Sequence, residues 1–207
     1  MYIPDPFRVP EAEHDALLAG LGLGCLVSCD AEGFWASHLP LIYDPTARRL
    51  QGHLARANPH HTRAPNGGRA LIVFQGPSAY VSPGWYASKA RDPRVVPTWN
   101  YEAVHVHGRL SWHDDPADIR AGLAALSDRH EADRAEPWSL DDAPADYLDR
   151  LQRGVVGLVV TIEQVYAKRK LSQNRPAADR AGVAVGLIDT GRPEAAAVAY
   201  RMLENND

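Results

Sequence analysis

The stretch GCLVSCDAEGFWASHLPLIYDPTARRLQGHLA, residues 24–55, decides the fold. It divides into three strand-like runs, Gly24–Asp30, Phe34–Asp44 and Arg49–Ala55, which are separated by the turn sequences Ala-Glu-Gly and Asp-Pro-Thr. Short runs joined by turn residues are typical of consecutive antiparallel strands. We therefore predict an antiparallel meander at the centre of the protein.

Further strands and helices extend this meander. Alternation from Asn100 onward places apolar residues on one face and polar residues on the other, which predicts a half-buried strand. We also predict strands at Ala70–Phe74 and Val155–Ala167, and helices at Glu11–Ala19, Asp115–His130, Pro144–Arg153, Pro176–Ile188 and Pro193–Asn205. Six or seven strands in meander order favour a mainly β fold, a split antiparallel β-barrel with added helices. We expect one domain over residues 1–207, with inserted helices at about 115–153 and C-terminal helices at about 176–205.

Composition excludes several classes of protein. The chain has 22 basic and 26 acidic residues, and its longest basic run is Lys168–Lys170, so we do not expect direct DNA binding. Two cysteines, Cys25 and Cys29, are too few for a disulfide framework and favour a reducing cytoplasm. The acidic, proline-containing N-terminus is unlike a secretory signal, and no apolar run is long enough to cross a membrane. No glycine-rich dinucleotide or phosphate loop follows a strand.

The segment from Phe74 to Trp112 is rich in aromatic residues and prolines. We interpret Pro77, Pro83, Pro93 and Pro97 as rigid turns in a wall that holds a flat aromatic ligand. Within it, Trp85, Tyr86 and Lys89 lie on an expected proline-bounded loop, where function is often carried. Trp99 either covers a flavin-like ring or is buried against one end of the barrel.

Two segments could bind anions. Arg56 and Asn58 follow an expected strand, and Pro59 is placed to begin a short helix, so the segment could form a phosphate cradle. The alternative is a surface arginine beside an Asx turn. The second segment, KRKLSQNRP at 168–176, offers three cations followed by varied hydrogen-bonding side chains. Its alternative is a solvated connector.

Histidines raise the question of a metal. His105 and His107 share one face of a predicted strand and could bind a metal together with His38 or His53. No carboxylate or cysteine accompanies them at metal-ligand spacing, which favours structural roles. Both cysteines lack a neighbouring base and are expected in the core.

Several strings together resemble the PaiB family of FMN-binding negative transcriptional regulators. They are MYIP, HLARANP, FQGPSAYVSPGWY, VPTWNY, HVHGRL and KLSQNRP, in unbroken order from Met1 to about Leu187. The resemblance implies a split barrel related to pyridoxamine-phosphate oxidase and a homodimer with FMN at the subunit interface. The residues it implies around FMN are Ser37, His38, Leu39, Pro40, His53, Ala55, Arg56, Ala57, Asn58, Gln75, Tyr80 and Ser82, with Trp99 and Lys170 reaching in from the partner chain.

The resulting hypothesis is a cytoplasmic, homodimeric FMN-binding split-barrel protein with an indirect regulatory role. A rival from another class is a flavin-dependent oxidoreductase acting on a small molecule, and its catalytic residues are not identified by the sequence. A third is a haem-binding or haem-degrading barrel with His38, His105 or His107 as ligand. An absorption spectrum distinguishes the two flavin-binding hypotheses from the haem-binding one.

Overall fold

A computed structural model describes residues Met1–Glu204. Its six strands are β1 (Leu23–Asp30), β2 (Gly33–Asp44), β3 (Arg49–Ala55), β4 (Gly68–Val81), β5 (Thr98–His113) and β6 (Val155–Lys170). Its α-helices are α1 (His14–Gly20), α2 (His60–Arg63), α3 (Pro116–Glu131), α4 (Ala145–Gln152), α5 (Ala177–Asp189) and α6 (Pro193–Glu204). The expected helix end at Asn205 lies outside the described residues.

The strands close into a barrel in the order β1-β2-β3-β6-β5-β4. Strand β1 closes the ring because it pairs with β2 along one edge and with β4 along the other, as Cys25 does with His38 and Val73. β3 pairs with both β2 and β6. The predicted antiparallel barrel with added helices is confirmed.

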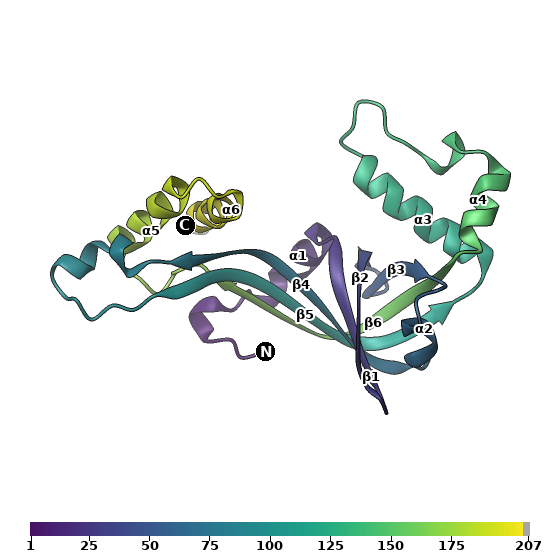
Figure 1. Cartoon of the computed structure of the whole chain (residues 1–207), viewed down its shortest axis with the longest axis horizontal. Coiled ribbons are helices and arrows are strands. Elements are labelled where there is room, and N and C mark those ends of the chain that lie inside the picture. The colour runs from purple at the N-terminus through teal and green to yellow at the C-terminus, as the bar shows by residue number, and fades with distance from the viewer. Residues whose placement is uncertain (205–207) are drawn as a thin grey trace. The chain divides into compact units, whose positions relative to one another are not determined.

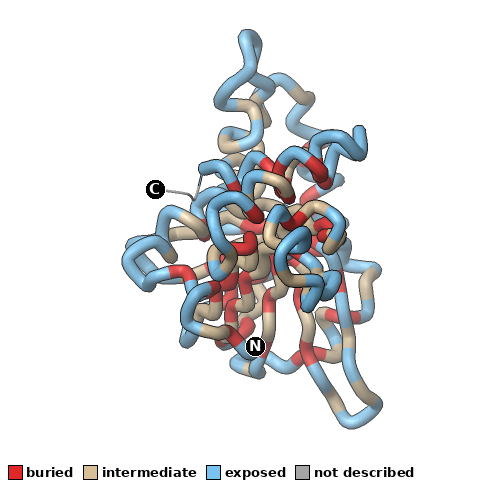
Figure 2. The backbone as a smooth tube through the Cα atoms, turned by 90° about the vertical axis from the view of Figure 1, so that its left-hand side faces the viewer, coloured by how far each residue is buried: buried red, intermediate tan, exposed pale blue. Residues whose placement is uncertain are grey.

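Alternation along the strands builds the core, since successive side chains point to opposite faces of a sheet. Leu26, Ile72, Val106, Leu110 and Val160 have no exposed surface and come from four of the six strands. In Figure 2 the loops are largely exposed, while buried residues recur along the strands and on one side of the helices.

Packing divides the chain into two compact units. We call residues 12–74 and 105–165 the barrel unit, and residues 1–11, 75–104 and the described part of 166–207 the terminal unit. Strands β4, β5 and β6 each have residues in both units. The single domain expected from the sequence stays a prediction.

In the terminal unit, α5 and α6 run side by side (Figure 1) and pack on a cluster of buried residues. Val81, Val183, Leu187, Val198 and Ala199 are fully buried in this cluster. Burying such side chains stabilises a fold by about 1.5–3 kcal/mol for each large residue. The terminal unit therefore has an apolar core of its own.

Most predicted elements were found, with two corrections. Cys29 is exposed and does not belong to the core, where it was expected. Pro77 lies inside β4, so its assignment to a rigid turn was wrong. In α4, Leu148 is buried, whereas Tyr147 and Leu151 are 44% and 50% exposed. No described helix is long and apolar enough to cross a membrane.

Candidate functional site

The four β2 residues expected near the cofactor lie on opposite faces of the strand. Ser37 and Leu39 point into the barrel and are 8% and 2% exposed. His38 lies on the outer face and is exposed, with Pro40 beside it and half-buried. Because neighbouring strand residues alternate, their four side chains cannot line one ligand. The side chain of Leu39 belongs to the core, which leaves only its backbone for a cofactor contact.

A buried hydrogen-bond network lies behind β2. His60 is 0% exposed, with Nε2 2.9 Å from Ser28 Oγ and Nδ1 2.9 Å from Ser37 Oγ. Asn58 Nδ2 donates to Ser37 Oγ at 3.0 Å. Burial lowers the pKa of His60, which keeps the ring neutral at neutral pH. The network fixes the turn after β3 against β1 and β2.

The sequence analysis did not identify His60. One available signal was the inward placement of Ser28 and Ser37, which strand alternation makes predictable and which requires a buried polar partner. Nothing local to His60 indicated that it supplies this partner, because Ser28 lies 32 residues away along the chain.

Arg56 lies just beyond β3, as predicted, but its guanidinium is already engaged. Nη1 lies 2.7 Å from Asp114 Oδ1, and Nε and Nη2 donate to the carbonyl oxygens of Arg153 and Val155 at 3.1 and 2.8 Å. A phosphate at Arg56 would have to take the place of the Asp114 carboxylate. Ala55 and Ala57, on either side, are exposed.

The turn after Arg56 matches the Asx-turn alternative. Asn58 Oδ1 accepts the backbone N–H of His60 at 3.0 Å. The following helix, α2, has only four residues, too few to build a substantial dipole. The phosphate cradle therefore has less support from backbone geometry than its sequence indicated.

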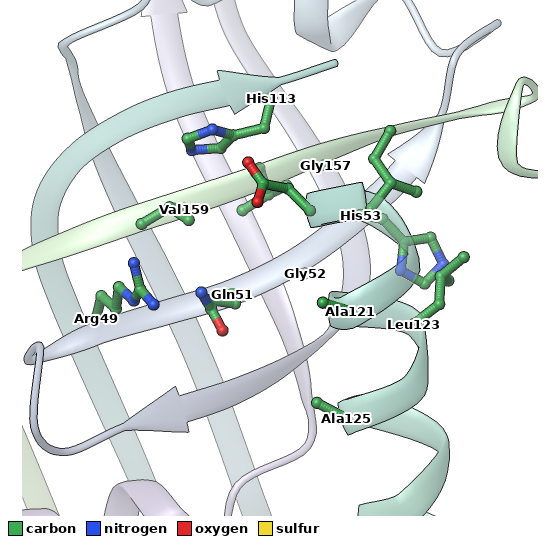
Figure 3. A pocket seen from close by; sticks show the side chains of 14 residues that line it. Arg49, Gln51, Gly52, His53, His113, Ala121, Leu123, Ala125, Gly157 and Val159 are labelled. Carbon is green, nitrogen blue, oxygen red and sulfur yellow. The ribbon is translucent and has the colours of Figure 1, made fainter. Parts of the chain in front are cut away.

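A pocket of about 380 Å³ lies beside β3 and α3 within the barrel unit (Figure 3). Arg49, Gln51 and His53 of β3 face it together with His113 of β5, and Gly52 and Gly157 contribute backbone without side chains. Its volume falls in the range typical of small-molecule sites, about 300–1,000 Å³.

Two histidines give this pocket its chemical character. Burial lowers the pKa of His53. His113 Nε2 is buried and has no hydrogen-bond partner among the described residues. A buried polar atom without a partner usually indicates a missing water, ion or ligand. His53 is the only member of the expected cofactor set that lines this pocket.

The remaining expected residues lie in the terminal unit. The rings of Tyr80 and Trp99 meet edge to face at 6.3 Å, and these residues are 49% and 55% exposed. Exposed aromatic rings of this kind can stack on a flat ligand. Gln75 is exposed, and Ser82 caps a short 3-10 helix by accepting the N–H of Gly84.

Lys170 ends β6 in the same unit. Its Nζ donates to Thr98 Oγ1 at 2.5 Å and to the carbonyl oxygen of Trp99. Lys170 therefore holds the backbone that carries Trp99. Lys168 is 8% exposed and donates to Tyr101 Oη at 2.7 Å, a structural role that its basic sequence context did not predict.

Trp85, which we expected on a functional loop, is a packing residue. A Cβ atom at Gly186 would lie 2.4 Å from the Trp85 indole, and one at Gly182 would lie 2.2 Å from its carbonyl oxygen. Helix α5 thus needs both glycines to approach this loop. Trp99 therefore remains a candidate for the wall that holds a flat aromatic ligand, and Trp85 does not.

The metal alternative gains no support. No group of three or more histidine, cysteine or acidic side chains suited to a metal ion occurs among residues 1–204. Burial lowers the pKa of His105, with smaller contributions from the N-terminal amine and His107.

Comparison with known proteins identifies the family. Residues 1–164 match the model of the family described as "Putative FMN-binding domain". The chain belongs to this family. It is 32% identical over 205 residues to the protease synthase and sporulation protein PAI 2 of Bacillus subtilis, covering 98% of this chain and 96% of that protein. The predicted PaiB resemblance is confirmed, and FMN is the cofactor that the family indicates.

Solved structures share the fold at low sequence identity. A conserved hypothetical protein from Mycobacterium tuberculosis superposes with a TM-score of 0.60 at 10% identity, covering 85% of this chain and 94% of that one. An FAD- and haem-binding protein from Mycobacterium smegmatis superposes with a TM-score of 0.60 at 15% identity, covering 86% and 79%. These similarities establish the split-barrel fold.

The residues of this chain fit an FMN group. The barrel unit offers a ligand-sized pocket with an unpartnered His113 nitrogen, and the terminal unit offers two exposed aromatic rings. A flavin has both an apolar ring system, which such rings can cover, and polar edges and a phosphate, which histidine, arginine and lysine can bind.

Proposed function

We propose that the protein is a homodimeric FMN-binding regulator of the PaiB type that acts without contacting DNA itself. The family match over residues 1–164 carries the proposal. When bound, FMN would supply the ability to accept and donate electrons. The chain's own residues would bind it, orient its ring and exclude water.

The proposal assigns different parts of the cofactor to different residues. Arg56 and Asn58 would bind the phosphate, since Arg56 is a cation at a strand end and its present carboxylate partner is exposed. His38 and His53 would contact the polar part of the cofactor. Trp99, supported by Lys170, would cover the ring and come from the partner chain. Ser37 and Leu39 would act by shaping β2.

The outer face of β1, β2 and β4 supports a dimer of two copies of this chain. Val27 pairs with Ala36 on one side and Leu71 on the other, which forms a continuous row of apolar side chains on the outer face. At its margins, Leu23 is 67% exposed and Phe34 is 84% exposed. A contiguous exposed apolar patch usually marks an interface, and a second copy could bury it symmetrically.

The regulatory role comes from the relative, whose name links it to protease synthesis and sporulation. A repressor that binds DNA directly usually neutralises about 6–10 phosphates with a clustered basic surface. This chain has a net charge of −4, and Lys168 in its one compact basic run is buried against Tyr101. Regulation would therefore act through a small molecule, a redox signal or a partner protein. Two free cysteines are in keeping with the cytoplasmic location that we propose.

Titration of flavin-free protein with FMN tests the binding proposal. We expect saturation at one FMN per chain with micromolar or tighter affinity, which corresponds to about 8 kcal/mol or more. Riboflavin should bind more weakly because it lacks the phosphate. Equal affinity for FMN and riboflavin would remove the phosphate site from the proposal, and absence of both would refute flavin binding.

A further inference from the structure

The terminal unit contains a small cleft of about 140 Å³ that differs from the pocket in Figure 3. It lies where β6 ends and α5 begins. It is lined by Phe7, Tyr86, Val96, Thr98, Asn100, Lys170, Ser172, Asn174 and Arg175. All nine residues belong to the terminal unit.

Two cations border this cleft. Lys170 Nζ has a hydroxyl and a carbonyl as acceptors, both uncharged, so its charge is not neutralised by them. The guanidinium of Arg175 stacks over the ring of Tyr86, 4.8 Å from its centroid. Stacking of this kind leaves the edge of the guanidinium, with its N–H donors, free to bind an acceptor.

An acid in the first turn of α5 does not balance these charges by direct contact. Asp179 is 1% exposed and accepts two hydrogen bonds from Ser88, at 2.7 Å from its N–H and 2.7 Å from its Oγ. Burial alone would raise the pKa of Asp179, but the hydrogen bonds from Ser88, with smaller contributions from the charges of Arg175 and Arg91, lower it overall. Both carboxylate oxygens are thus committed to the Ser88 loop.

The hydroxyl of Tyr86 is a second, independent observation. Tyr86 is 3% exposed, and its Oη atom is buried without a hydrogen-bond partner among the described residues. Buried hydroxyl groups almost always have a partner, so one that lacks it next to a cleft indicates a ligand or ordered solvent there. As a donor beside two cations, this hydroxyl suits a negatively charged acceptor.

The backbone just after β6 also adopts an uncommon conformation. Ser172 has a φ of 66°, in the left-handed region that residues other than glycine rarely adopt. Its side chain exchanges hydrogen bonds with the buried amide of Asn100 at 3.0 and 3.2 Å. Strained turns that are held in this way occur preferentially at functional sites.

From these features we propose that the cleft is a binding site for a phosphate-type oxyanion, held by Lys170, Arg175 and the Tyr86 hydroxyl. The anion is either a free phosphate or the phosphate group of FMN, and in the second case this cleft would replace Arg56 as the phosphate site of the proposed function. The volume of the cleft excludes a flavin ring, since sites for ligands of that size span about 300–1,000 Å³. The site is argued from this chain's residues and does not depend on the assignment of Arg56 to the FMN phosphate.

The electrostatic surroundings of Lys170 agree with this geometry. Burial lowers its pKa, and the charges of Lys168 and Arg175 lower it further. A bound anion would oppose both effects and raise that pKa.

Calorimetric titration of the flavin-free protein with inorganic phosphate tests the site. We expect one site per chain, with affinity lowered at least tenfold in the double variant Lys170→Met and Arg175→Met, since each charged hydrogen bond contributes about tenfold or more. Arg192→Met is the matched control, because Arg192 is an exposed cation of the same unit outside the cleft. Equal phosphate affinity in the wild type and the double variant would overturn the proposal. So would a wild type that does not bind phosphate, together with unchanged FMN affinity in the double variant.

Repeating the titrations with FMN and riboflavin distinguishes the two sources of the anion. If FMN supplies the phosphate, inorganic phosphate competes with FMN, and the double variant weakens FMN but not riboflavin. If the anion is separate, phosphate binds equally to flavin-free and FMN-loaded protein. Failure of FMN to bind at all would refute the proposed function and would leave the phosphate titration as an independent test.

Tyr86→Phe separates ligand binding from folding. Removing a hydroxyl without a protein partner should leave the melting temperature of the anion-free protein unchanged or raise it. The same variant should weaken phosphate binding about threefold to tenfold, as expected for one lost hydrogen bond. A variant that melts earlier and binds phosphate normally would show that the hydroxyl is structural, contrary to its proposed role.

Discussion

Arg56 Nη1 lies 2.7 Å from Asp114 Oδ1, in an ion pair whose side chains are 41% and 70% exposed. Exposed ion pairs of this kind contribute only about 0–1 kcal/mol, because water competes for both partners. A phosphate with charge-assisted hydrogen bonds can replace such a carboxylate. The pair is therefore compatible with Arg56 serving as a cofactor ligand, held in position by the carbonyl oxygens of Arg153 and Val155 until FMN binds.

Replacement of Arg56 by alanine is expected to weaken FMN binding by about 1.5–3 kcal/mol, or about tenfold to a hundredfold. The reason is the loss of a charged hydrogen bond to the phosphate. Fluorescence titration measures the change. Arg150→Ala is the control, since Arg150 stacks on Tyr147 and lies outside the expected cofactor set.

Asp114→Ala should act in the opposite direction and strengthen FMN binding by up to about fivefold, because the competing carboxylate is gone. Unchanged FMN affinity in both the Arg56 and the Asp114 variants would remove Arg56 from the binding site.

The buried network around His60 is expected to be important for stability. His60→Ala would leave the hydroxyls of Ser28 and Ser37 without their partner and would open a cavity, which together cost about 2–4 kcal/mol. Urea denaturation at pH 7 measures the loss. His130→Ala, at an exposed position on α3, should change the free energy of unfolding by less than about 0.5 kcal/mol. Equal effects of the two variants would contradict the importance of the network.

Stability should fall as the pH decreases below about 6.5, the pKa of histidine in an unfolded chain. Burial lowers the pKa of His60 and of His53 in the folded state. In the window between the folded and unfolded pKa values, the unfolded chain binds a proton that the folded chain does not, which favours unfolding. Melting temperatures between pH 7.5 and 5.5 test this, and His60→Asn should show a smaller decrease than the wild type.

The proposed dimer can be disrupted from the outer face of β1 and β2. Ala36→Arg places a charge in the apolar row, and we expect sedimentation to show one chain mass instead of two. Ala117→Arg, at an exposed position of α3, is the control. A monomeric Ala36→Arg variant that binds FMN as tightly as the wild type would show that the site is not at this interface.

Direct DNA binding is not expected. A gel shift at near-physiological salt with the chain's own upstream DNA should show no sequence-specific complex, because 26 acidic residues outnumber 22 basic ones. A nanomolar, sequence-specific shift by the pure protein would restore direct repression.

The strands of the barrel could be predicted from the sequence because alternation and turn residues are local features. Strand β3 was predicted with its observed bounds, Arg49–Ala55, since turn residues flank a clear alternating run. β4 was predicted to end at Phe74, because Pro77 was interpreted as a turn residue. The strand instead continues to Val81. Tertiary packing decides such cases and is not visible in a local pattern.

The site was less predictable because its contacts are long-range. The sequence placed Arg56 at a strand end but could not reveal its pairing with Asp114, 58 positions along the chain. The sequence placed Trp85 on a functional loop and left Trp99 either covering a ligand or buried, yet Trp85 packs against the glycines of α5 and Trp99 is exposed. Which aromatic side chain remains free to bind a ligand depends on the fold.

The absorption spectrum of the purified protein, after incubation with FMN and haem in equal amounts and removal of the unbound ligand, tests the central claim most directly. The account predicts the visible bands of a bound flavin at one FMN per chain, with no Soret band. A Soret band without flavin absorption would favour the haem-binding alternative, and a colourless protein would contradict cofactor binding altogether.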